Sequence, residues 1–155
     1  MTNMLTIEQA SHLYQSDYQL WLAETAQKLR SQDFGNLDLD NLIEEVESLG
    51  RRERNAISSY LMRLCEHLLK IRYWESERDY CLRGWSREVN NFRIAIQREL
   101  ESSPSLWSFL QDCFVKEYLN GRKLFLNASG LDAKSIPEKS FFTLEQALDD
   151  DWLPY

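Results

Sequence analysis

Acidic side chains gather where a long helical pattern begins, and their spacing could bind a divalent cation or arginine side chains. Asp40, Glu44 and Glu47 are spaced i, i+4, i+7 and therefore share one face of a helix, with Glu45 in the same two turns. Calcium and magnesium ions need several oxygen ligands, which one helix rarely supplies alone. The spacing therefore favours a solvated or salt-bridged face that also opposes the helix dipole. A metal would need ligands from another helix.

Two polar residues lie among the apolar residues farther along the same helical pattern. At about 100° per residue, Glu53 and His67 both point toward whatever the helix packs on, so each needs a buried partner. For His67 we expect a structural hydrogen bond to another helix, because no HExxH spacing exists. For Glu53 we expect a salt bridge to an arginine. The alternative is catalysis or metal binding across helices, with Glu44, Glu47, Glu53 or His67 acting as in carboxylate bundles.

Three aromatic residues line one side of an earlier helical pattern. Tyr14, Tyr18 and Trp21 fall on the same face of a helix expected from Thr6 to about Arg30. Such a stripe is normally core, because each ring buries a large apolar area, and a cage for a cationic ligand is the minority interpretation. Asp17 lies on the adjoining flank, where it could meet arginines of another helix.

The element that must position these groups is a long helix predicted from Asp38 to Trp74. At about 1.5 Å per residue it would span roughly 50 Å, which is long for a domain of this size. Gly50 interrupts it, and we expect a kink there rather than a reversal, since the apolar face is kept on both sides. The apolar residues at helical spacing are Leu42, Val46, Leu49, Ile57, Tyr60, Leu64, Leu68 and Ile71.

The remaining chain predicts further helices separated by loops. Residues 1–5 should be a loose end, and Thr6 with Gln9 offers a capping box for the first helix. Loops are expected at Ser31–Leu37, with turn conformations at Gly35 and Asn36, and at Glu75–Leu82. Further helices are expected at Trp85–Leu100 and from a start at Ser103 and Pro104 to an end at Gly130. A short helix opened by Thr143 should end before Asp149, and an apolar clasp of Trp152, Leu153 and Tyr155 should follow it. This pattern predicts an all-α bundle of four main helices and a short C-terminal one, in a single domain over residues 1–155.

Charge and composition narrow the classes of function. The chain of 155 residues has a net charge of −7, but its middle, from 51 to 98, is basic between two acidic ends. Arg83, Arg87 and Arg93 could form a basic surface, although an acidic chain makes nucleic-acid binding the weaker interpretation. Three cysteines without CxxC spacing, no signal peptide and no apolar run long enough to span a membrane predict a soluble, cytoplasmic protein. Phosphate-loop, dinucleotide-binding and GxSxG motifs are missing from the sequence.

The ordered segments YQSDYQLWLAETAQKLR, LDLDNLIEEVESLG, HLLK, SPSL and TLEQALDDDWLP extend over nearly the whole chain. Together they resemble the bacterial domain-of-unknown-function family 29, which is abundant in cyanobacteria. The resemblance implies an all-helical stand-alone domain and brings no particular activity, cofactor or catalytic residue. The positions that match the family's motifs include Asp17, Trp21, Asn41, Glu44, Glu45, Glu47, Gly50, His67 and Lys70.

Helices with caps and core stripes but no complete ligand motif favour a protein-interaction or regulatory module over a bundle enzyme or metal-binding protein. We expect no cofactor, and a partner that is another protein or a second copy of this chain. A homodimer is predicted because the long helix could overhang its own domain and because acidic and basic zones are segregated.

Overall fold

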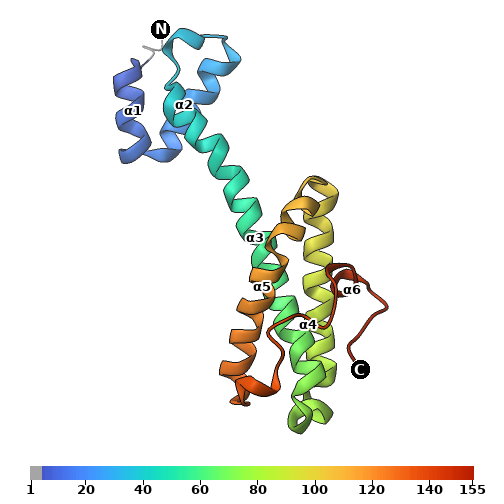
Figure 1. Ribbon diagram of the computed structural model, residues 1–155. Coiled ribbons are helices and arrows are strands. Elements are labelled where there is room, and N and C mark those ends of the chain that lie inside the picture. Colours follow the sequence, from blue (N-terminus) through green and yellow to red (C-terminus); the bar gives the residue numbers. More distant parts are fainter. Residues whose placement is uncertain (1–4) are drawn as a thin grey trace. The chain divides into compact units, whose positions relative to one another are not determined.

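The computed structural model describes residues 5–155, and all but the last residue of the loose end expected for residues 1–5 lie outside them. The elements are α1 (Ile7–Ser16), α2 (Tyr18–Arg30), η1 (Phe34–Asn36), α3 (Leu39–Tyr73), α4 (Glu75–Ser102), α5 (Leu106–Ser129), η2 (Ala133–Ser135) and α6 (Leu144–Leu148) (Figure 1). No residue from 5 to 155 forms a strand, so the all-α prediction is confirmed.

The described chain forms two compact units, which meet in sequence after Arg51. The N-terminal unit, residues 5–51, contains α1, α2 and the first part of α3. The C-terminal unit, residues 52–155, contains the rest of α3 together with α4, α5 and α6. Helix α3 is uninterrupted through Gly50 and therefore contributes to both units.

The N-terminal unit begins with two helices rather than the one that the sequence predicted. The capping box of Thr6 and Gln9 is confirmed, but α1 ends at Ser16 because Asp17 leaves the helical region, with φ −150° and ψ 82°. The carboxylate of Asp17 accepts a hydrogen bond from the backbone N–H of Leu20 at 3.1 Å and thereby caps α2. Asp17 is thus a helix cap and not a partner for an arginine.

The turn after α2 is held by a buried lysine. Lys28 is almost fully buried, and its Nζ donates a hydrogen bond to the carbonyl oxygen of Asn36 at 2.9 Å. Gln32 adopts the left-handed backbone conformation, with φ 58°. Gly35 and Asn36 supply turn conformations as predicted, because both belong to the 3-10 turn η1.

Helix α4 begins directly after α3, so the loop predicted at Glu75–Leu82 is wrong. The guanidinium of Arg78 donates hydrogen bonds to the carbonyl oxygens of Ile71 at 2.8 Å and Arg72 at 2.7 Å. These bonds satisfy acceptors at the end of α3 that would otherwise have no helical partner. The charged run without apolar periodicity is therefore the first two turns of α4.

The connection from α4 to α5 also differs from the prediction. Ser103 ends α4, and its hydroxyl donates to Glu53 rather than capping α5, which starts at Leu106. Two other termini are as predicted: Gly130 ends α5 in the left-handed conformation with φ 68°, and Thr143 forms a capping box with Gln146 at the start of α6.

The C-terminal unit has an extensive apolar core, in which the second part of α3 lies beside α4 and α5 (Figure 1). Gly121 of α5 permits a very close approach to α3, because a Cβ there would lie 2.7 Å from the carbonyl oxygen of Met62. Trp152 and Leu153 pack on this core as the predicted clasp, whereas Tyr155 is exposed. Within residues 5–155, no helix combines the length and apolar character needed to cross a membrane.

Candidate functional site

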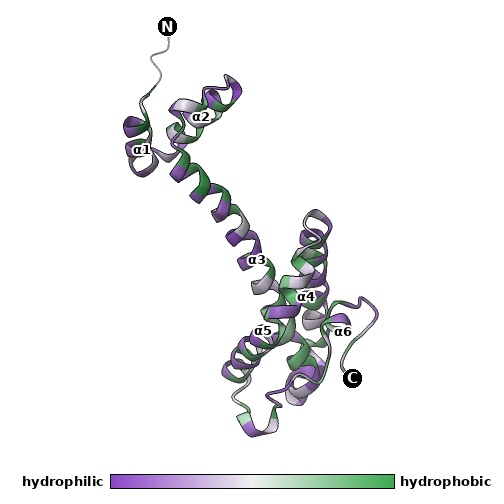
Figure 2. Ribbon diagram, turned by 45° about the horizontal axis from the view of Figure 1, so that its top comes forward, coloured by the Kyte–Doolittle hydropathy of each residue, from purple (hydrophilic) through white to green (hydrophobic). Residues whose placement is uncertain are grey.

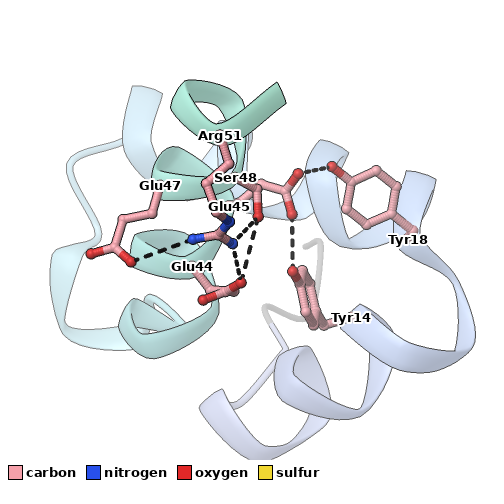
Figure 3. Close-up of polar contacts among 7 residues, drawn as sticks. All are labelled: Tyr14, Tyr18, Glu44, Glu45, Glu47, Ser48 and Arg51. Atoms are coloured by element: carbon pink, nitrogen blue, oxygen red, sulfur yellow. Dashed lines mark hydrogen bonds and ion pairs between the residues drawn. The ribbon is translucent and has the colours of Figure 1, made fainter. Parts of the chain in front are cut away.

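The N-terminal unit is organised around a buried carboxylate. Glu45 of α3 accepts a hydrogen bond from the hydroxyl of Tyr14 at 2.9 Å and another from the hydroxyl of Tyr18 (Figure 3). The bond to the Glu45 carboxylate raises the pKa of the Tyr14 phenol, because the neutral phenol is the better donor to a negative group. One acidic residue of α3 therefore joins α1 and α2 through their tyrosines.

A second carboxylate extends this network. Asp38 is buried and accepts hydrogen bonds from the indole N–H of Trp21 at 3.1 Å and from the side-chain amide of Asn41 at 2.7 Å. Trp21 is 1% exposed, and its ring lies edge-on to Tyr14 with centroids 4.8 Å apart. The predicted core role holds for Trp21, and its burial argues against a cage for a cationic ligand.

The acidic face of α3 is salt-bridged. Arg51 lies 2.6 Å from Glu44 and 3.9 Å from Glu47, and it donates to the hydroxyl of Ser48 at 2.8 Å (Figure 3). These carboxylates are more than half exposed, so each ion pair contributes at most about 1 kcal/mol. Nowhere in residues 5–155 are three His, Cys, Asp or Glu side chains arranged to hold a metal.

The opposite face of α3 in this unit is apolar and open to solvent. Leu39, Ile43, Val46 and Leu49, which we call the apolar stripe, are 57%, 48%, 61% and 59% exposed. Figure 2 shows hydrophobic ribbon recurring along this part of α3. At about 100° per residue, Glu45 lies about 160° around the helix from Ile43. Glu45 therefore points inward, while the apolar stripe and the acidic residues Glu44 and Glu47 remain exposed, so the prediction that Val46 and Leu49 are core is wrong.

Glu53 and His67 belong to the C-terminal unit, and their partners differ from those predicted. The Glu53 carboxylate accepts a hydrogen bond from the Ser103 hydroxyl at 2.7 Å, not a salt bridge from an arginine. The Nδ1–H of His67 donates to the carbonyl oxygen of Arg63 at 2.8 Å, one turn earlier in the same helix rather than on another helix. Burial lowers the pKa of His67, whose ring packs against Phe92. The contacts of His67 are thus with a backbone carbonyl and an aromatic ring.

Sequence reasoning missed a buried ion-pair network beside His67. Glu66 is buried, and its carboxylate lies 2.9 Å from Arg63 and 3.4 Å from Lys70. The contact with Arg63 is an ion pair without hydrogen-bond geometry, since the Oε2 atom has no hydrogen-bond partner. The i, i+3 and i, i+4 spacings of these residues could have indicated the network.

The predicted basic surface loses one of its three members. Arg83 and Arg87 are exposed on α4, but Arg93 is fully buried. Its guanidinium donates to the carbonyl oxygens of Ala147 and Trp152, each at 2.8 Å, and so holds the C-terminal segment. The sequence carried a signal for this burial, because Arg93 lies on the same helical face as the apolar core of α4.

The C-terminal unit also has an open cavity of about 430 Å³, lined by α5 and by residues between 138 and 145. Phe114, Tyr118 and Phe142 make its lining mainly apolar. None of the candidate residues from the sequence lines this cavity. The apolar lining of the cavity suits a small apolar group and indicates no particular reaction.

Comparison with protein families identifies a match over most of the chain. A family model, Domain of unknown function DUF29, matches residues 13–153 and thus includes parts of both units. Comparison with curated proteins and with solved structures gives no significant match.

Proposed function

The chain belongs to the DUF29 family, and we propose that it is a protein-interaction module whose contact surface is the apolar stripe of α3. One observation carries the proposal: the N-terminal unit buries Glu45 of α3 and leaves the four apolar side chains of the stripe exposed. A contiguous exposed apolar patch with a polar rim is typical of a surface that binds another macromolecule.

The energetics support the same conclusion. Full burial of a Leu, Ile or Val side chain is worth roughly 1.5–3 kcal/mol relative to exposure. The stripe presents four such side chains along about three helical turns, from Leu39 to Leu49. Because these side chains are only 48–61% exposed, a partner that covers them gains about half of this free energy for each, and helix packing supplies a suitable geometry.

The enzyme or metal-binding alternative has less support. Its four candidate residues already have protein partners: Glu44 and Glu47 pair with Arg51, Glu53 accepts from a serine hydroxyl, and the Nδ1–H of His67 donates to a backbone carbonyl. The first two belong to the N-terminal unit and the last two to the C-terminal unit. A catalytic site would instead leave groups free to converge on a substrate.

Nucleic-acid binding also has less support, because burial of Arg93 leaves only Arg83 and Arg87 of the basic residues first considered. The net charge of −7 opposes association with a phosphate backbone. We place the protein in the bacterial cytoplasm, a proposal supported by three cysteines that form no disulfide.

Photo-crosslinking in the producing cells tests the interaction proposal. A benzophenone amino acid replaces Val46 in one variant and Val115 in the other, a matched control because both valines are exposed on helices, at 61% and 69%. We expect a discrete protein adduct at position 46 and none at position 115. Equal adducts at both positions, or none at position 46, would refute the proposal.

A further inference from the structure

The apolar stripe has a complementary surface on the same chain. Resting on the interaction proposed above, we propose that the stripe binds α4 of a second copy, at a basic face formed by Arg83, Arg87, Ile94 and Arg98. At about 100° per residue, these four positions fall within about 60° of one another on α4. All three arginines are exposed, and Ile94 is 46% exposed.

Charge complementarity is the first argument for this pairing. The N-terminal unit, residues 5–51, has nine acidic and three basic residues, a net charge of −6. Asp40, Glu44 and Glu47 flank the stripe on one side, and Arg51 can balance only one of these three charges. A basic surface that covers the stripe would neutralise the remainder.

The arginines on the basic face of α4 are free to pair with acidic groups of another copy. Among the described residues, Arg83, Arg87 and Arg98 make no ion pair and no side-chain hydrogen bond, so their guanidinium groups remain available. Guanidinium groups bind carboxylates in a bidentate geometry that fixes orientation as well as charge.

The apolar parts also match. Ile94 can contact the stripe directly, and the three-carbon stems of the arginines can cover the remaining aliphatic side chains while their heads reach the acidic rim. The stripe from Leu39 to Leu49 extends about 15 Å along its helix, and the basic face from Arg83 to Arg98 about 22 Å. The basic face is therefore long enough to cover the whole stripe.

Other occupants fit less well. Pairing of two stripes would bring together two units of charge −6, and an anionic membrane or a nucleic acid would be repelled in the same way. A second copy carries a basic surface on α4, which meets no such repulsion.

Charge reversal tests the pairing, with the oligomeric state of the full chain measured by analytical ultracentrifugation. We expect the wild-type chain to dimerise, and the double variants Glu44→Arg/Glu47→Arg and Arg83→Glu/Arg87→Glu each to dissociate at least about tenfold more readily. An equimolar mixture of the two variants should dimerise again, because each contact then joins opposite charges. The matched control Lys116→Glu/Lys123→Glu, exposed on α5, should leave the dimer intact.

The outcomes separate this inference from the proposed function. A wild-type chain that stays monomeric at high micromolar concentration, or a mixture that fails to restore the dimer, overturns the pairing of the stripe with α4. The charge reversals could leave the dimer unchanged while Val46→Asp dissociates it, or position 46 could crosslink to a different protein. In either case the stripe remains an interaction surface, but its occupant is not α4 of a second copy. Absence of any crosslinked adduct at position 46 would refute the proposed function as well.

Discussion

The two units of the chain are stabilised by different chemistry. The C-terminal unit holds eighteen of the buried hydrophobic residues described, whereas the N-terminal unit holds three, which are Ala10, Trp21 and Leu37. Four of the seven buried hydrophobic or polar residues in the N-terminal unit are polar, against four of twenty-two in the C-terminal unit; the four in the N-terminal unit are Thr25, Lys28, Asp38 and Glu45. It also exposes nine large hydrophobic residues against seven in the C-terminal unit, which is about twice as long. A unit built in this way relies on directional hydrogen bonds and leaves apolar surface exposed.

Helix α3 shows that the difference comes from the surroundings and not from the pattern of the helix itself. Ile43 and Ile57 are two heptads apart and differ by only about 40° in helical projection. Ile43 is 48% exposed, whereas Ile57 is completely buried. Nearly the same face of α3 is therefore core in the C-terminal unit and surface in the N-terminal unit.

Truncation of these two isoleucines should give the largest contrast. Ile57→Ala is expected to lower the free energy of unfolding by about 2–5 kcal/mol, because it leaves a cavity in the core. Ile43→Ala should cost less than about 1 kcal/mol, because its side chain is already in solvent. Urea denaturation at low protein concentration, where self-association is weak, measures both. Similar losses for the two variants would contradict the distinction between the units.

Two glycine substitutions test how closely α3 and α5 pack in the C-terminal unit. Gly121→Ala places a Cβ 2.7 Å from the carbonyl oxygen of Met62 and 2.9 Å from the backbone nitrogen of Glu66, so we expect a loss of about 1–3 kcal/mol. Gly84→Ala meets no atom within 4 Å and should stabilise α4 by up to about 1 kcal/mol. Thermal unfolding of the pair provides the measurement. A neutral Gly121→Ala variant would show that α3 and α5 do not approach this closely.

The polar network should matter only in the N-terminal unit. Glu45→Gln replaces a charged acceptor of two tyrosine hydroxyls by a neutral amide, and we expect that unit to lose about 1–2 kcal/mol. Hydrogen–deuterium exchange should become faster in α1 and α2, while exchange in α5 stays unchanged. Uniformly faster exchange in both units would contradict the assignment of this network to the N-terminal unit alone.

The smallest effect we expect is a pH dependence of the C-terminal unit at His67. Burial, opposed by the hydrogen bond to Arg63 and the charge of Glu66, lowers the pKa of His67 below its usual 6.5, and the charge of Lys70 adds to the lowering. The unfolded chain therefore binds the proton more readily, so stability is fully present above about pH 6.5 and declines as the pH falls below it. Denaturation series in the wild type and in His67→Gln measure this, and the variant should show a flatter profile. Equal slopes would exclude His67 as the cause.

Local signals in the sequence were sufficient for several helix ends. The capping boxes at Thr6 and Thr143 and the left-handed Gly130 were predictable, because each depends on residues within one turn. The break at Asp17 was missed because the apolar pattern continues across it. The start of α4 was missed because Arg78 satisfies the end of α3 from seven residues away.

The orientation of α3 in the N-terminal unit could not be predicted from its own sequence. Val46 and Leu49 extend the stripe that is buried from Ile57 onward, so periodicity alone assigned them to the core. The hydroxyls of Tyr14 and Tyr18 decide the orientation, because they supply hydrogen bonds that make burial of Glu45 favourable. Such long-range partners cannot be read from helical spacing.

Thiol labelling measures the exposure of the stripe most directly. Ile43→Cys and Ile57→Cys are each made in a chain carrying Cys81→Ser and Cys113→Ser; Cys65 remains, because it is fully buried and burial raises the pKa of its thiol. At low micromolar concentration, we predict that the thiol introduced by Ile43→Cys reacts within about tenfold of the rate of a free thiol, whereas the thiol introduced by Ile57→Cys reacts only through global unfolding. Equal protection of both introduced thiols under these conditions would contradict the claim that α3 turns its apolar face outward in the N-terminal unit.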